Sequence, residues 1–199
     1  MKNKSKTIKI FPIGLTVLPK DIVPLHIFEE RYKILVRNCI DEDDIFGMVY
    51  RDKNKNIRQY GCIVKISSVE NQYSDGRLDI IVEGYERFKI ISSKKNEELW
   101  TSNIEIIEEE ANKNDDTLFH KVFDKYLQLL IFMGKDEFIQ QEILKKNSFD
   151  LTRNVLLPNK IKQKLISLDS ENERLLFIEK ILDKYLVSNQ AKINNNSLN

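Results

Sequence analysis

The hydrophobic pattern of this chain changes its period at one polar run, and that change limits the folds open to it. Before residues 108–116, apolar side chains recur mainly at every second position, as in β-strands. After the run, they recur at the three- and four-residue spacing of amphipathic helices. The run has no apolar periodicity and is typical of a linker. The sequence therefore predicts an α+β protein, with a β-rich subdomain over residues 1–110 and a helical bundle over residues 116–188.

The β-rich part is expected to form a curled antiparallel sheet with one short amphipathic helix at about 28–40. Asp75-Gly76 lies between two alternating runs and predicts a hairpin turn, because these residue types tolerate positive φ. The polar stretch 92–98 is expected to be a loop. Strands are expected over residues 7–11, 13–18, 45–49, 62–67, 78–82, 87–91 and 104–109.

The helical part begins after the linker and contains several start and stop signals. Ser170 and Glu173 have the spacing of a capping box, in which each side chain bonds the other residue's backbone N–H. The Asn-rich end, residues 189–199, buries nothing and is predicted to be a disordered tail. Helices are expected over residues 117–133, 136–145, 149–157 and 159–167, and from about 170 to 187.

Composition limits the partners and the compartment that can be expected. Basic and acidic residues nearly cancel, leaving a formal net charge of +1, so the chain lacks the broad positive field of a nucleic-acid binder. The start of the chain is basic, but Pro12 and Gly14 interrupt the apolar stretch that a signal peptide needs. The apolar run at 127–133 is too short to cross a bilayer. We therefore expect a cytoplasmic protein with no membrane partner.

The sequence offers little catalytic chemistry. None of the six glycines has the spacing of a phosphate-binding loop, so ATPase activity is not expected. The two histidines, His26 and His120, are too far apart in sequence to indicate a zinc site, and neither a metal nor a cofactor is expected. A nucleophilic pair of His26 with Cys39 or Cys62 is conceivable, but both thiols lie in apolar segments and are interpreted as core residues.

Several short motifs together resemble the N-terminal substrate-recognition domain of Lon proteases, the peptidase S16 LON domain. Their order and spacing carry the resemblance, which covers nearly the whole chain. It implies a PUA-like β-barrel followed by a small helical bundle. The motifs are Phe11-Pro12-Ile13, Leu18-Pro19, Pro24-Leu25-His26-Ile27-Phe28-Glu29, Arg31-Tyr32, Phe46-Gly47, Gly61, Asp75-Gly76-Arg77, Val82-Glu83-Gly84 and Arg87-Phe88, with weaker ones at Lys162-Gln163-Lys164-Leu165 and Glu173-Arg174-Leu175. The chain departs from the family pattern at Leu18, Lys20 and Glu30, where Phe, Gly and Pro are often found.

The resemblance implies a function in protein recognition. The chain lacks the ATPase and Ser-Lys peptidase domains of a complete Lon protease, so it resembles a stand-alone, non-enzymatic adaptor. Such a module would bind exposed polypeptide segments in a groove between barrel and bundle, alone or beside a separate protease or chaperone. The candidate contact residues are Phe28, Glu29, Arg31, Tyr32, Phe46, Arg77 and Arg87. The aromatic candidates could equally be core residues, and Glu29 and Arg31 could equally belong to a solvated helix face.

Two other functions remain open at this stage. PUA-like barrels are used for RNA binding elsewhere, so RNA is an alternative partner. Its basic patch would consist of Arg77, Arg87, Lys89, Lys94 and Lys95. A cryptic hydrolytic enzyme that uses Ser93 or Cys62 is the third possibility, although no acid, base or nucleophile constellation supports it.

Overall fold

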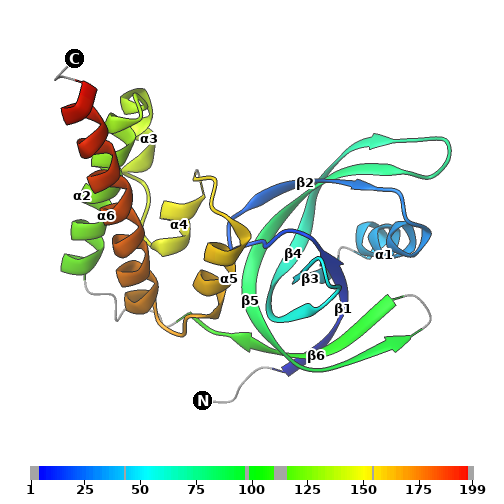
Figure 1. The fold of residues 1–199 in the computed structure, drawn as a ribbon. Coiled ribbons are helices and arrows are strands. Elements are labelled where there is room, and N and C mark those ends of the chain that lie inside the picture. Colours follow the sequence, from blue (N-terminus) through cyan, green and yellow to red (C-terminus); the bar gives the residue numbers. More distant parts are fainter. Residues whose placement is uncertain (1–4, 43, 97–98, 110–115, 154, 197–199) are drawn as a thin grey trace. The chain divides into compact units, whose positions relative to one another are not determined.

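The chain divides into two compact units in a computed structural model (Figure 1). The structure describes residues 5–42, 44–96, 99–109, 116–153 and 155–196, and of residues 96 and 188–196 it describes the backbone alone. The first unit comprises Met1–Glu108 and Leu157–Ser167. The second comprises Glu109–Leu156 and Leu168–Asn199. Most of the predicted linker, residues 110–115, lies outside the described residues.

The first unit is built on one sheet with the strand order β2-β5-β4-β3-β1-β6, in which β5 also pairs with β6. The five strands β5, β4, β3, β1 and β6 therefore form a barrel-like ring (Figure 1). Strand β2 pairs with the first part of β5, and β6 pairs with the last part. The predicted α+β fold is confirmed. The strands are β1 (Ser5–Ile13), β2 (Ile22–Ile27), β3 (Ile45–Arg51), β4 (Ile57–Gln72), β5 (Leu78–Asn96) and β6 (Leu99–Ile107).

The sheet is mixed, so the expectation of a purely antiparallel barrel is corrected. β1 and β3 are parallel, with Ile10 opposite Gly47 and Ile13 opposite Tyr50. A parallel pair needs a long crossover, and residues 14–44 supply one that contains β2 and the helix α1 (Glu30–Asp41). The hairpin at Asp75-Gly76 is confirmed: Gly76 has φ 82°, and the Tyr73 N–H donates to the Arg77 carbonyl at 3.0 Å.

The predicted strand at 13–18 is wrong, because most of this segment is a loop that packs against the sheet. Leu18 is fully buried, yet its N–H donates to the Asp21 side chain at 3.0 Å instead of to a neighbouring strand. Lys20 adopts φ 69°, and its N–H donates to the Gly84 carbonyl at 2.7 Å. Glycine adopts such a left-handed backbone without steric cost, whereas a residue with a Cβ, such as lysine, adopts it less readily.

The predicted loop at 92–98 is also wrong over most of its length. Strand β5 continues to Asn96, and its last residues pair with β6, Lys95 opposite Trp100 and Asn96 opposite Leu99. Residues 91–95 are all exposed, so polar side chains suit a projecting hairpin as well as a loop. The turn itself, residues 97–98, lies outside the described residues.

Two helices complete the first unit. Helix α1 buries Tyr32, Leu35, Val36 and Cys39 on one face, and the Tyr32 ring lies 4.0 Å from the Phe11 ring. Helix α5 (Asn159–Ser167), which matches its predicted range, is bound to the loop 14–21 and to the sheet. Its contacts are Thr16 N–H to Asn159 Oδ1 at 2.8 Å, Lys162 Nζ to Asp21 Oδ2 at 2.7 Å and Arg87 NH1 to the Ile166 carbonyl at 3.0 Å.

The second unit is helical, as the sequence predicts. The predicted capping box is present: the Ser170 N–H donates to Glu173 Oε2, and the Glu173 N–H donates to Ser170 Oγ, both at 3.2 Å. The helices predicted at 136–145 and 149–157 are shorter than expected, and the last helix continues past residue 187 to Asn196. The elements are α2 (Asp116–Phe132), η1 (Asp136–Phe138), α3 (Ile139–Glu142), α4 (Ser148–Thr152) and α6 (Glu171–Asn196). The segment predicted as a tail thus overlaps α6, and residues 197–199 are not described.

The core of the second unit contains one fully buried arginine. Arg174 donates to Ser148 Oγ at 3.0 Å, to Glu171 Oε2 at 2.9 Å and to the Leu168 carbonyl at 3.2 Å, and also pairs with Glu109. These contacts connect the first residue of α4 with the start of α6 and with Leu168 just before it. None of the helices in the described part of the chain has both the length and the apolar composition needed to cross a membrane.

Candidate functional site

Strand β2 has two apolar faces, and only one of them serves the core. Its inward side chains include Leu25, 7% exposed, and Ile27, 1% exposed. The alternate positions point the other way and are solvent-exposed: Ile22, Pro24, His26 and, just after the strand, Phe28. Phe28 is 61% exposed and Ile22 53%. A row of apolar side chains that contributes nothing to the core is available for contact with another molecule.

Three rings from two segments meet at the end of this row, and we call His26, Phe28 and Tyr73 the aromatic cluster. The Phe28 ring stacks on His26 with a centroid distance of 6.0 Å. The Tyr73 ring meets His26 edge-on at 6.0 Å. The Arg77 guanidinium lies over Tyr73, 4.8 Å from the ring centroid. Residues of β2 and of the β4–β5 hairpin are thus brought together, although about 50 positions separate them in sequence.

Asp79 holds the aromatic cluster in place. Its carboxylate lies 2.6 Å from His26 Nδ1 and accepts from Tyr73 Oη at 2.7 Å and from Asn71 Nδ2 at 3.0 Å. These hydrogen bonds, the one to His26 first, lower the pKa of Asp79 to about 2. The hydrogen bond between Tyr73 and Asp79 raises the pKa of Tyr73, because the Tyr73 hydroxyl donates to a carboxylate. The orientation of two rings therefore depends on one ionised side chain.

The depressed pKa of Asp79 predicts a pH-dependent contribution to stability. Because the folded-state pKa of about 2 lies below the unfolded value of about 4, the contribution is present above pH 4. It should be lost as the pH falls from about 4 to about 2. We expect Asp79→Asn to melt below the unaltered protein at pH 7, with the gap closing between pH 4 and pH 2 in thermal denaturation followed by circular dichroism. A gap that stays constant over this range would show that Asp79 does not carry the effect.

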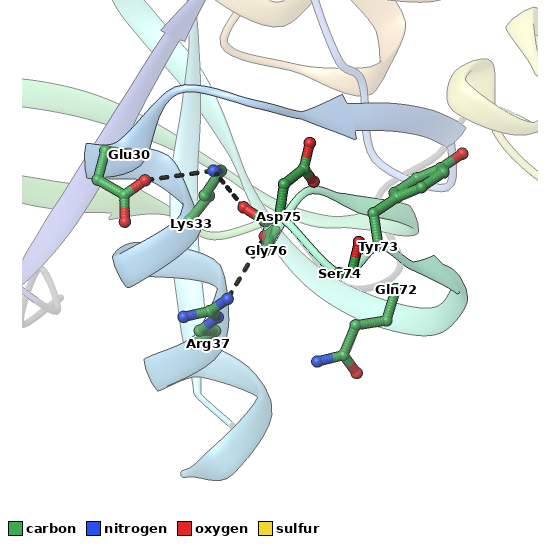
Figure 2. A pocket seen from close by; sticks show the side chains of 8 residues that line it. All are labelled: Glu30, Lys33, Arg37, Gln72, Tyr73, Ser74, Asp75 and Gly76. Carbon is green, nitrogen blue, oxygen red and sulfur yellow. Dashed lines mark hydrogen bonds and ion pairs between the residues drawn. The ribbon is translucent and has the colours of Figure 1, made fainter.

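A pocket of about 720 Å³ opens beside the cluster, between α1 and the tip of the β4–β5 hairpin (Figure 2). Lys33 Nζ donates to the Asp75 carbonyl at 3.0 Å and lies 3.2 Å from Glu30 Oε2. Arg37 NH2 approaches the Gly76 carbonyl at 3.5 Å. The lining residues are Glu30, Lys33, Arg37, Gln72, Tyr73, Ser74, Asp75 and Gly76. Tyr73 belongs both to this pocket and to the aromatic cluster.

Four of the seven candidate contact residues are at least partly accessible around this region. Phe28 belongs to the cluster, and Arg77 lies over Tyr73 and pairs with Asp75 at 2.7 Å. Glu29 and Arg31 form an ion pair at the start of α1. The binding role of these four residues stays a prediction.

The other three candidate residues are buried inside the first unit. Tyr32 is 4% exposed, Phe46 is fully buried and Arg87 is 1% exposed. Tyr32 and Phe46 both pack against Phe11, at ring distances of 4.0 and 6.1 Å. Arg87 donates to the carbonyl of Ile166 in the last turn of α5. A cation at this end of a helix also interacts favourably with the negative end of the helix dipole. These three side chains therefore position α1, β3 and α5 and are not available for direct contact.

Sequence reasoning missed several residues of the site, namely His26, Lys33, Arg37, Tyr73 and Asp79. Two signals could have identified three of them, His26, Lys33 and Arg37. Residues 22–28 place apolar or ring side chains on both faces of one strand, whereas a half-buried strand needs apolar side chains on its inward face only. On α1, Glu30, Lys33 and Arg37 have helical spacing and so share one face.

The chemical alternatives receive no geometric support. Burial raises the pKa of Cys62 and raises that of Cys39 to about 11, the opposite of what a nucleophilic thiolate requires. Among the residues that the structure describes, no three His, Cys, Asp or Glu side chains are grouped as metal ligands. The proposed basic patch is dispersed: Arg87 is buried, and Arg77 and Lys94 lie near opposite ends of β5.

Comparison with known proteins identifies the family. The model of the ATP-dependent protease La (LON) substrate-binding domain matches residues 7–184. The chain therefore belongs to this family of substrate-binding domains, and the resemblance seen in the sequence is confirmed.

Solved structures show the same fold. A Lon N-terminal domain protein from Xanthomonas campestris is similar with a TM-score of 0.69 and 21% identity. The N-terminal domain of the Mycobacterium avium complex Lon protease is similar with a TM-score of 0.72 and 20% identity. Each similarity covers 89% of this chain and 98% of the other.

Proposed function

We propose that this chain is a non-catalytic recognition module that binds exposed segments of other polypeptides through the aromatic cluster and the outward face of β2. Membership of a family of substrate-binding domains supports a role in polypeptide recognition. The observation that carries the proposal is the 61% exposure of Phe28 at the end of a row of apolar side chains that the core does not use. A separate protease or chaperone could then receive the captured polypeptide.

The energetics of this surface suit the capture of apolar side chains. Each Å² of apolar surface removed from water contributes about 25 cal/mol, and Phe28 and Ile22 both have more than half of their surface available. The Phe28 ring is stacked on His26, which Asp79 holds in place. A preoriented ring loses little conformational entropy when a segment binds.

Recognition should proceed through side chains instead of strand addition. Pro24, in the middle of β2, has no N–H to offer an added strand. In β4, the register with β5 shifts between Ile66 and Ser68 and again between Val69 and Asn71. Such bulges disturb the regular hydrogen-bonding edge that an added strand requires. A surface that binds side chains without a fixed backbone register can accept segments of varied sequence.

Phe28→Ala should weaken binding to an unfolded polypeptide about ten-fold, because it removes the most exposed ring of the cluster. The probe is reduced, carboxymethylated lactalbumin, with native lactalbumin as the folded reference, and the dissociation constant is measured by fluorescence anisotropy. The melting temperature should change little, because an exposed side chain contributes little to the core.

Ile91→Ala is the matched control for this experiment. Ile91 lies on β5, outside the cluster and the β2 row, and is 58% exposed, so it offers a comparable amount of apolar surface elsewhere on the same unit. Its affinity for the unfolded probe should equal that of the unaltered protein. Equal losses in the two variants, or no preference for the unfolded probe, would contradict the proposal.

A further inference from the structure

We propose that the pocket between α1 and the β4–β5 hairpin is a carboxylate-binding subsite, so that the segments recognised here combine an apolar anchor with a nearby carboxylate. The carboxylate could belong to an acidic side chain or to a chain terminus. This inference rests on the proposed function and specifies which segments the surface prefers. The family match covers residues 7–184 as one domain and assigns no role to this pocket.

Tyr73 couples the pocket to the aromatic cluster. One part of its ring meets His26 edge-on at 6.0 Å, and the same residue lines the pocket (Figure 2). A segment that places an apolar side chain against Phe28 and His26 therefore has its next residues beside the pocket.

The charges that line the pocket leave one cation uncompensated. Lys33 and Glu30 pair at 3.2 Å. Asp75 pairs with Arg77, which donates from Nε at 2.7 Å and from its backbone N–H at 3.2 Å. These bonds, the backbone one first, lower the pKa of Asp75, so its charge is retained and already engaged. Arg37 has no carboxylate partner within the described part of the chain; its one polar contact there is the Gly76 carbonyl at 3.5 Å.

The position of Arg37 suits a carboxylate ligand. A guanidinium can donate two parallel hydrogen bonds to a carboxylate, and a single long contact to Gly76 leaves most of the Arg37 donors available. Gly76 also makes the approach possible, because a Cβ at this position would lie 2.7 Å from Arg37 NH2. The turn glycine thus lets the arginine lie across the hairpin tip, at the edge of an open pocket (Figure 2).

The spacing along α1 predicts the spacing in the ligand. Arg37 lies seven positions after Glu30 on the helix, which is a rise of about 10 Å at 1.5 Å per residue. Phe28 lies just before the helix. An extended segment covers about 3.3 Å per residue, so the carboxylate should lie about three or four positions from the apolar anchor.

The test uses three fluorescein-labelled peptides that share one phenylalanine anchor. The first has glutamate at the fourth position after the anchor and an amidated end. The second has glutamine there and the same end. The third ends at that position with a free carboxylate. Binding is measured by fluorescence anisotropy with the full chain. We expect both carboxylate peptides to bind about five-fold more tightly than the glutamine peptide, as for an exposed charged pair.

Arg37→Gln should remove this preference and leave the affinity for the glutamine peptide unchanged. Arg58→Gln is the matched control, because Arg58 is also exposed and lies on β4 outside the pocket. Preference for the internal glutamate alone, or for the free terminus alone, would support the subsite and identify the source of the carboxylate. Equal affinity for all three peptides, still sensitive to Phe28→Ala, would overturn the subsite and leave the proposed function intact. Binding of none of them would count against both.

Discussion

Gly84→Ala is expected to lower the free energy of unfolding by about 3 kcal/mol, because no space exists for a side chain at this position. A Cβ on Gly84 would lie 2.3 Å from the Leu18 carbonyl oxygen and 3.1 Å from Cys62 Sγ. The nearest obstacle is backbone, so rotation of a side chain cannot relieve the clash. The Lys20 N–H donates to the Gly84 carbonyl at 2.7 Å, and the Gly84 N–H donates to the Asp21 carbonyl at 2.9 Å. Moving the loop would break both bonds.

The measurement is urea denaturation followed by circular dichroism, with Gly14→Ala as the matched control. Gly14 lies in the loop 14–21, the loop that also contains Leu18, and nothing lies within 4 Å of a Cβ added to it. That variant should therefore stay within about 0.5 kcal/mol of the unaltered protein. Because the loop leads directly into β2, Gly84→Ala should also weaken binding of unfolded lactalbumin. A Gly84→Ala protein as stable as the Gly14→Ala protein would show that the loop does not pack as described.

Arg174→Ala is expected to destabilise the second unit by about 3–5 kcal/mol, since it removes one partner of a buried ion pair. Arg174 is 1% exposed and bonds Ser148, Glu171 and the Leu168 carbonyl. Its guanidinium also lies 4.7 Å from the centre of the Phe149 ring. Without it, Glu171 would keep its bonds to Ser148 but lose its only cation within the described residues.

Lys121→Ala provides the comparison for this prediction. Lys121 pairs with Glu179 at 3.0 Å between α2 and α6, but its side chain is 62% exposed. Solvent screens such a pair, so the loss should be below about 1 kcal/mol. Thermal denaturation followed by far-ultraviolet circular dichroism reports on both variants, because the second unit is helical. Similar losses for the two substitutions would contradict the buried role of Arg174.

Periodicity predicted the class of each half of the chain, because strands and helices of a soluble protein bury one face at different spacings. Helix α5 and the capping box of α6 were predicted residue by residue, because both depend on local signals: Pro158, Ser170 and Glu173. The parallel pairing of β1 with β3 was not predictable in this way, because register between distant strands is a property of the whole sheet.

Errors in strand prediction came from tertiary contacts that override local pattern. The apolar segment 13–18 resembles a strand, but its backbone bonds are directed to Asp21 and to helix α5. The polar segment 92–98 resembles a loop, but pairing with β6 keeps most of it extended.

The candidate site was predicted only in part for the same reason. Phe28 and Arg77 were identified from motifs, yet their connection runs through His26 and Tyr73, which only the paired strands bring together. Motif residues also divide between two tasks that sequence alone does not separate. Phe46 and Arg87 hold the core, whereas Phe28 points into solvent.

The most direct test of the central claim is photocrosslinking from position 28 itself. Phe28 is replaced by benzoylphenylalanine, and a second protein carries the same group at Ile91 as the exposed control. Each is irradiated with unfolded or native lactalbumin, and the crosslinked peptides are mapped by mass spectrometry. Recognition by the aromatic cluster predicts crosslinks from position 28 to the unfolded polypeptide, with few from position 91 and few to the native protein. Equal crosslinking from the two positions, or none from position 28, would contradict it.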